Sequence, residues 1–142
     1  MLKGDLEKRL SDWYNLRKDI EVKKEYYSLL IDFWSDIKPI AFNHRVDPYN
    51  TKKWPTPWDI ISENKFDDFT LALMMGYSLK LTNKFADIPI EIHTMVDRNK
   101  TKLYNILVIN NDDVLNYNKE AVIKTQDIDS ELYLENKVEI VY

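Results

Sequence analysis

Apolar residues recur at steps of three, four and seven through the first part of the chain, from about Asp5 to Ile37. This spacing gathers them on one side of a helix, so it predicts a helical N-terminal segment over residues 1–40, as one long helix or two. Asp5 supplies an N-cap, and Pro39 an end, because the residue before a proline avoids the α conformation. The simplest interpretation of the apolar stripe is a core face, and the alternative is a face that binds a partner. The stripe consists of Leu6, Leu10, Trp13, Ile20, Tyr27, Leu30, Phe33, Trp34 and Ile37.

An irregular segment follows over residues 41–60 and contains the run Trp54-Pro55-Thr56-Pro57-Trp58. Two prolines two positions apart favour extended backbone without regular pairing. We interpret the segment as a structured loop whose two indoles, of Trp54 and Trp58, pack into the domain. The alternative is a proline-rich ligand for an aromatic groove, although the flanks are neither proline-rich nor of low complexity. Thr56 and Pro57 also have the pattern of a helix start.

A second helix is predicted from Asp67 or Asp68 to Thr82, and it is apolar on almost all sides, which is typical of a buried helix. Asp67 and Asp68 lie in its first turn, where negative charge suits the helix dipole. Gly76 in its middle costs about 1 kcal/mol relative to alanine. We therefore expect close packing at Gly76, against a tryptophan or proline of the preceding loop.

The remaining residues alternate between apolar and polar positions and predict antiparallel strands. The expected strands are residues 88–96, 103–109 and 114–117, followed by a last hairpin of 133–134 and 138–142 that turns at Asn136-Lys137. Residues 61–142 would thus hold a helix and a sheet. Helices followed by antiparallel strands predict one α+β domain over residues 1–142, with a central buried helix packed on the sheet.

Composition excludes several functional classes. The chain has 142 residues, a net charge of −4 and no cysteine, so disulfides, cysteine-bound metals and thiol chemistry are excluded. Charges of both signs are interspersed without a basic stripe, which argues against nucleic-acid binding. No apolar run approaches the roughly 20 residues that span a bilayer, and no apolar signal segment opens the chain. Lysine far outnumbers arginine, and asparagine, aspartate, isoleucine and tyrosine are abundant, which is typical of an AT-rich genome such as that of many phages. We expect no membrane association and a cytoplasmic protein, or a virion protein if the source is a phage.

Two motifs resemble the bacterial transglutaminase-like cysteine peptidases. The run from Trp54 to Ile61, followed by Asn64-Lys65-Phe66-Asp67-Asp68-Phe69-Thr70-Leu71, is similar to that family's Trp-Pro element and its Gly-Asp-Cys-Glu-Asp element, whose cysteine opens a buried helix. Residues 104–108 fall where the family has its histidine strand, and residues 114–117 fall where it has its aspartate strand. The resemblance covers about residues 54–117 and implies a papain-like or transglutaminase-like fold.

The resemblance implies that the catalytic triad is replaced. In that family a thiolate attacks a carbonyl, a histidine relays the proton and an aspartate orients the histidine. The matching positions here are Phe66, Asn105 and Asn116. Phenylalanine has no nucleophilic atom, and asparagine does not titrate near neutral pH. We therefore expect a pseudoenzyme that needs no cofactor.

A rival hypothesis is a metal-assisted hydrolase. Glu91 and His93 lie two apart on a predicted strand and so share one face. With Asp97, or with Asp67 and Asp68, they would form a carboxylate-rich metal or acid–base site. Other chemistry lacks support, because no Gly-x-Ser-x-Gly elbow is present and two glycines cannot build a phosphate-binding loop.

The favoured hypothesis is a non-catalytic interaction or structural protein, such as a phage virion, tail or assembly component. Its partner would be another protein or a second copy of the chain. Amphipathic aromatic side chains are favoured anchors of interfaces. The candidate binding residues are Trp13, Tyr14, Tyr27, Trp34, Trp54 and Trp58.

Overall fold

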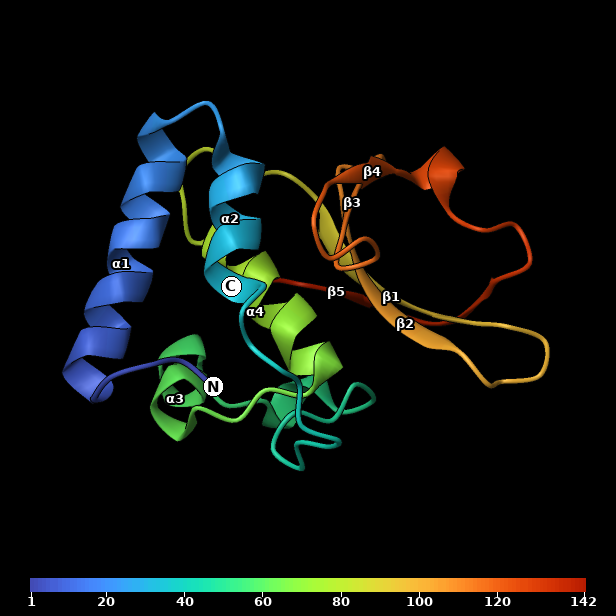
Figure 1. Cartoon of the computed structure of the whole chain (residues 1–142), viewed down its shortest axis with the longest axis horizontal. Helices are drawn as coiled ribbons and strands as arrows, with labels where there is room; N and C mark the ends of the chain where they lie inside the picture. Colours follow the sequence, from blue (N-terminus) through green and yellow to red (C-terminus); the bar gives the residue numbers. More distant parts are fainter.

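The computed structural model describes all residues from 1 to 142, and in it a break at residues 23–25 divides the N-terminal segment into two helices. Helix α1 (Leu6–Val22) is capped by Asp5, whose carboxylate accepts a hydrogen bond of 2.9 Å from the Lys8 amide. Helix α2 (Tyr26–Trp34) returns beside it, as Figure 1 shows. The periodicity therefore located the helical segment, and the structure decides between the two alternatives in favour of two helices.

Two further helices come next, and the first of them begins inside the segment predicted to be irregular. That segment also contains a short 3₁₀ turn at Thr51–Lys53. Helix α3 (Pro57–Glu63) begins as its sequence predicts, with the Thr56 hydroxyl accepting a hydrogen bond of 3.1 Å from the Asp59 amide. Helix α4 (Asp68–Lys80) is enclosed on nearly all sides and runs between α2 and the sheet. None of the four α-helices combines the length and the apolar character needed to cross a bilayer.

Five antiparallel strands form one sheet in the order β4-β3-β2-β1-β5. Their bounds are β1 (Ile90–Val96), β2 (Leu103–Ile109), β3 (Asp113–Leu115), β4 (Ile123–Lys124) and β5 (Tyr133–Glu139). The first four follow each other as a meander, whereas β5 crosses to the far edge and pairs with β1. The fold class, α+β with a buried helix against an antiparallel sheet, is thereby confirmed.

The predicted last hairpin is wrong. Residues 133–139 form a single strand that runs straight through Asn136 and Lys137, which pair with Thr94 and His93 of β1. The ladder to β1 satisfies the backbone of these two residues, so their turn propensity does not decide the conformation. A register shift between Thr94 and Met95 accommodates the pairing.

The two faces of the sheet bury different clusters. The face toward α4 contributes Ile92 and Leu107 to the main core, which also contains side chains from all four helices. The opposite face carries a small cluster of Ile106, Val108 and Val114, covered by side chains of the segment after β3. Because side chains alternate along a strand, Thr94 and Asn105, which pair across β1 and β2, lie on the helix-facing side.

Candidate functional site

The two aspartates at the start of α4 have separate roles. Asp67 is the N-cap. Its carboxylate accepts hydrogen bonds from the backbone N–H of Thr70 at 2.7 Å, the Thr70 hydroxyl at 2.6 Å and the backbone N–H of Asn43 at 3.0 Å. Asp68 is the first residue of the helix, and its carboxylate is directed toward the sheet instead. The sequence pattern placed both residues at the helix N-terminus, and both lie there. Only Asp67 caps the helix, whereas the Asp68 side chain contacts the sheet.

A polar cluster surrounds the Asp68 carboxylate. Oδ2 accepts hydrogen bonds from the backbone N–H of Asn105 at 3.3 Å and from its side-chain amide at 3.2 Å. Oδ1 accepts a hydrogen bond of 3.3 Å from the side-chain amide of Asn116. The Lys119 ammonium donates to Oδ1 at 3.1 Å and to the side-chain oxygen of Asn116 at 2.8 Å. Four donors therefore hold the carboxylate, one of them the cation that compensates its charge.

The strands position the two asparagines. Asn105 lies on the helix-facing side of β2, and its side-chain oxygen accepts a hydrogen bond of 2.8 Å from Thr94 on β1. Asn116 follows β3 directly and has a left-handed backbone with φ of 64°, a conformation that asparagine tolerates better than most residues. Its amide also donates to the Asn105 carbonyl at 2.8 Å. Both asparagines are buried, which fixes their side chains against the carboxylate.

Phe66 does not belong to this cluster. Its ring is buried in the core and packs edge-to-face on Trp34, with 5.6 Å between ring centroids. The structure thus brings Asn105 and Asn116 together beside Asp68, whereas Phe66 lies apart from both. The reason is the helix start: Asp67 occupies the cap, so the residue that opens the helix and faces the sheet is Asp68.

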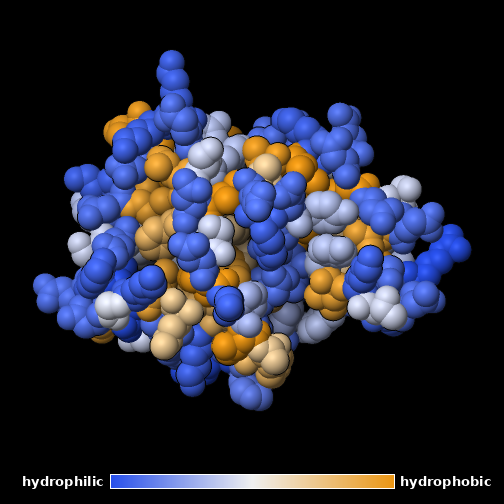
Figure 2. Space-filling model, in the orientation of Figure 1, coloured by the Kyte–Doolittle hydropathy of each residue, from blue (hydrophilic) through white to orange (hydrophobic).

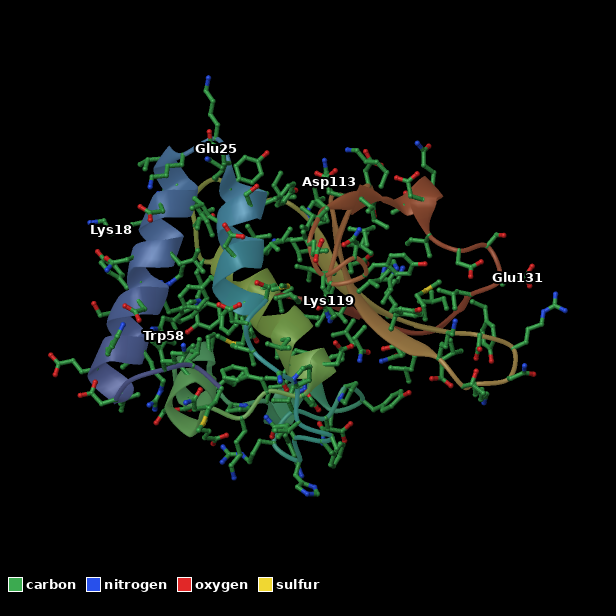
Figure 3. All side chains as sticks on the ribbon, in the orientation of Figure 1. Lys18, Glu25, Trp58, Asp113, Lys119 and Glu131 are labelled. Atoms are coloured by element: carbon green, nitrogen blue, oxygen red, sulfur yellow. The ribbon has the colours of Figure 1, made fainter.

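Two cavities border the Asp68 cluster. One, of about 220 Å³, lies between α2, α4 and the segment after β3, and its walls include Trp34, Leu71, Asn116 and Lys119. The other, of about 330 Å³, lies toward β1 and β5, with Asp68 and Asn105 in its wall. In Figure 3 Lys119 lies between the helices and the sheet. Figure 2 shows hydrophilic groups down the middle of this face, with apolar groups on either side. The cluster therefore contributes residues to the walls of both cavities, which we refer to together as the groove.

The six aromatic residues predicted as a binding face differ in exposure: two are buried, two are half-buried and two are exposed. Trp13 and Trp34 are buried, at 0% and 1% exposure, so neither can anchor a partner on the surface, and this part of the prediction is corrected. The Trp13 indole donates a hydrogen bond of 2.8 Å to Ser78. Tyr14 and Trp58 remain exposed, at 53% and 37%, and for them the prediction stands untested.

Two other residues of that set make contacts within the chain. Tyr27 donates a hydrogen bond of 2.8 Å to Asp113, and burial together with this acceptor raises the pKa of Tyr27. The indole of Trp54 donates to the Asp47 carbonyl at 2.6 Å and packs edge-to-face on Phe69. Trp54 thus anchors the irregular segment against α4, as the structured-loop interpretation requires.

The carboxylate and histidine pair expected for a metal site is isolated from further ligands. His93 Nε2 lies 3.1 Å from Oε1 of Glu91 on the face of the sheet away from α4. Asp97 instead accepts hydrogen bonds from Thr101 and Lys102, which lower its pKa. No group of three or more histidine, cysteine, aspartate or glutamate side chains is placed to hold a metal ion.

The sequence contains a signal for Asp68. Aspartate is a favoured N-cap residue, so with Asp67 as the cap, Asp68 is the first residue of the helix. The role of Lys119 had no comparable signal, because its contact with Asp68 joins positions 51 residues apart.

Comparison with known proteins finds structural likeness without sequence likeness. The chain resembles calcium-bound Legionella pneumophila LapG with a TM-score of 0.65 and 15% identity, covering 96% of this chain and 77% of that one. Against EGTA-treated LapG the TM-score is 0.60 at 15% identity, covering 94% and 73%. A third LapG structure gives 0.58 at 16%, covering 94% and 74%. No family model and no curated protein sequence matches the chain.

LapG is a bacterial transglutaminase-like cysteine protease. At this level of identity the likeness concerns the fold, and it confirms the fold that the sequence motifs implied. The chain thus has a transglutaminase-like α+β fold, in which Asp68 at the start of α4 contacts Asn105 on β2 and Asn116 directly after β3.

Proposed function

We propose that this domain is a catalytically inactive form of the transglutaminase-like fold that binds an extended polypeptide segment in the groove across Asp68. One observation carries the proposal: the Asp68 carboxylate is held by four donors, from Asn105, Asn116 and Lys119. A carboxylate paired with an ammonium group and amide donors is a weak nucleophile. Its neighbours contain no imidazole or thiol, so both the thiol nucleophile and the histidine relay of the cysteine peptidases are missing from the cluster.

The groove supports the binding half of the proposal. Its two cavities, of about 220 and 330 Å³, are each larger than the apolar cavity of about 150 Å³ that accepts a benzene molecule. Each cavity can therefore hold one side chain of a peptide that passes over the Asp68 cluster. A fold can retain its groove as a binding surface after its chemistry is lost. The abundance of residues with A/T-rich codons is compatible with a phage source, so such a domain would act in a phage virion, in a tail or in assembly.

The experiment combines a turnover assay with a retention assay on one peptide library. Immobilised protein is incubated with short peptides of mixed sequence, and mass spectrometry identifies both cleaved products and peptides retained intact. We expect retention without cleavage. Cleavage that Asp68→Ala abolishes would refute the proposed inactivity.

Two blocking variants locate the binding. Ser35 and Ala41 are exposed and line the first and second cavity respectively. Ser35→Trp and Ala41→Trp should each reduce retention by filling the groove, whereas Ser130→Trp, at an exposed position lining neither cavity, should not. Equal retention by all four proteins would show that peptides bind elsewhere and would refute the groove.

A further inference from the structure

The cavity toward β1 and β5 has an unbalanced charge. Its wall contains three carboxylates, of Asp67, Asp68 and Glu135, and no lysine, arginine or histidine. Asp67 is buried, at 8% exposure, and its oxygens accept hydrogen bonds from Thr70 and Asn43. Asp68 and Glu135 are the two acidic groups that remain, and each side chain is 34% exposed. Both are accessible to a ligand.

The present counter-ions of these two acids are exposed lysines. Lys119 pairs with Asp68 at 3.1 Å and is 58% exposed. Lys100 approaches Glu135 only to 3.9 Å and is 68% exposed. Exposed ion pairs of this kind are weak, because water screens them and long side chains lose entropy in forming them. A ligand cation that replaces Lys100 breaks only this long contact, whereas one that replaces Lys119 also breaks its hydrogen bond of 2.8 Å to Asn116.

Aromatic rings complete the wall of the same cavity. Phe42 and Tyr49 are 58% and 72% exposed, an unusual placement for large aromatic side chains, and Phe69 lies deeper at the start of α4. Rings attract cations over their faces, and guanidinium groups in particular stack on them. Carboxylates beside aromatic faces form an environment that favours a cationic side chain over an apolar or acidic one.

We propose that this cavity holds a basic side chain of the bound peptide, arginine in preference to lysine, which replaces Lys119 as the counter-ion of Asp68. The inference rests on the proposed function and adds the class of ligand. Arginine is preferred because its planar fork can donate to Asp68 and Glu135 while its face lies against a ring. The other cavity, with walls from Ile31, Leu71 and Met75, would then take an apolar neighbour of that arginine.

The test uses two fluorescent, end-capped pools of short peptides that differ at one fixed position, arginine in one pool and citrulline in the other. Citrulline keeps the shape of arginine and removes its charge. Anisotropy titrations with the full chain should give a dissociation constant about tenfold lower for the arginine pool. The difference should shrink as salt is added, since screening weakens the ion pair.

Three variants examine the same exchange. Glu135→Gln should weaken binding of the arginine pool by about tenfold and leave the citrulline pool unchanged. Lys119→Met removes the competing internal cation, so it should tighten binding of the arginine pool by about two- to fivefold. Lys8→Met breaks a comparable exposed pair with Asp12 on α1, at the same 58% exposure, and should change nothing.

The outcomes separate the two proposals. If both pools bind equally and Ser35→Trp weakens both, the groove binds peptides but the basic subsite is refuted. Tighter arginine binding with no effect of Glu135→Gln or Lys119→Met would also refute this cavity as the site. If neither pool binds, both proposals fail. Arginine-dependent cleavage would refute the proposed inactivity while supporting the subsite.

Discussion

The hydroxyl of Tyr27 on α2 donates a hydrogen bond of 2.8 Å to Oδ2 of Asp113 on β3, and this contact links the helical half of the protein to the sheet. Burial, and then the Asp113 carboxylate, raise the pKa of Tyr27 because both disfavour a phenolate. Burial also raises the pKa of Tyr77 in α4. The ordinary pKa of the unfolded chain is 10.0 for both groups, so the contact has a consequence at alkaline pH.

Tyr27→Phe should lower the free energy of unfolding by about 1 kcal/mol at neutral pH, the usual value of one hydrogen bond. Asp113 stays paired with Lys124 at 2.6 Å, so no carboxylate is left without a partner. Because the folded-state pKa is raised, the stabilisation is complete below pH 10 and declines above it, as the unfolded chain releases its proton. Urea titrations from pH 8 to 11 should show a shallower decline for Tyr27→Phe, whereas Tyr49→Phe, at 72% exposure, should match wild type.

Trp13 and Tyr14 are adjacent in sequence but differ in role. Trp13→Ala removes a fully buried ring and its hydrogen bond to Ser78, so it should cost about 3–5 kcal/mol of unfolding free energy. Tyr14→Ala, at an exposed position, should change stability by no more than about 0.5 kcal/mol. Chemical denaturation measures both values. If Trp13→Ala were as mild as Tyr14→Ala, the burial of Trp13 would be refuted.

Sedimentation separates the remaining interface prediction from stability. If exposed Tyr14 and Trp58 anchor self-association, Tyr14→Ala should shift a concentrated sample toward monomer without lowering its unfolding midpoint. A wild-type monomer at every concentration would contradict self-association through this face.

Local signals predicted the elements and the fold class well where they agreed with tertiary packing. The helical stripe, the Thr56 cap and the alternation along β1 depend on neighbouring residues, and all appear in the structure. Asn136 and Lys137 failed as a turn because strand β1, about 40 residues earlier, supplies their ladder partners. Sequence propensity does not contain such long-range pairing.

The site was predictable to the same degree. The contact between Asn105 and Asn116 follows from the order and alternation of the strands, which the sequence pattern contains. That Asp68, and not Phe66, lies beside them depends on which residue follows the helix cap, and the pattern alone did not decide this. The ion pair of Lys119 with Asp68, 51 residues apart, required the three-dimensional structure.

Gly76 in α4 is close to the C-terminal segment, and not to a tryptophan or proline as its position suggested. A Cβ atom there would overlap Cδ1 of Ile140 and approach Cδ1 of Leu107 to 3.2 Å. Gly76→Ala should therefore destabilise the protein by about 1–3 kcal/mol through overpacking, although alanine is favoured by about 1 kcal/mol in an exposed helix. Thermal unfolding measures the change.

The matched background for this test is Ile140→Val, which removes the Cδ1 atom that the new methyl group would meet. In that background Gly76→Ala should cost less than in wild type, and the difference is the coupling between the two positions. Equal costs in both backgrounds would show that Ile140 is not the limiting neighbour.

Rebuilding a catalytic triad tests the position of Asp68 directly. The triple variant Asp68→Cys, Asn105→His, Asn116→Asp places a thiol at the first residue of α4, beside an imidazole on β2 and a carboxylate after β3. The helix N-terminus and the imidazolium should lower the pKa of that thiol from about 8.5 into the range of about 3.5–7.5. The wild-type chain has no cysteine, so the pH dependence of alkylation reports this thiol alone.

The matched control carries Phe66→Cys with the same two strand substitutions. Its thiol would lie in the core against Trp34, where apolar surroundings raise the thiol pKa and slow alkylation. We therefore expect rapid alkylation at pH 6 only for the variant with cysteine at position 68. Rapid alkylation of the position 66 variant instead would restore Phe66 as the residue that faces Asn105 and Asn116, and would overturn the cluster around Asp68.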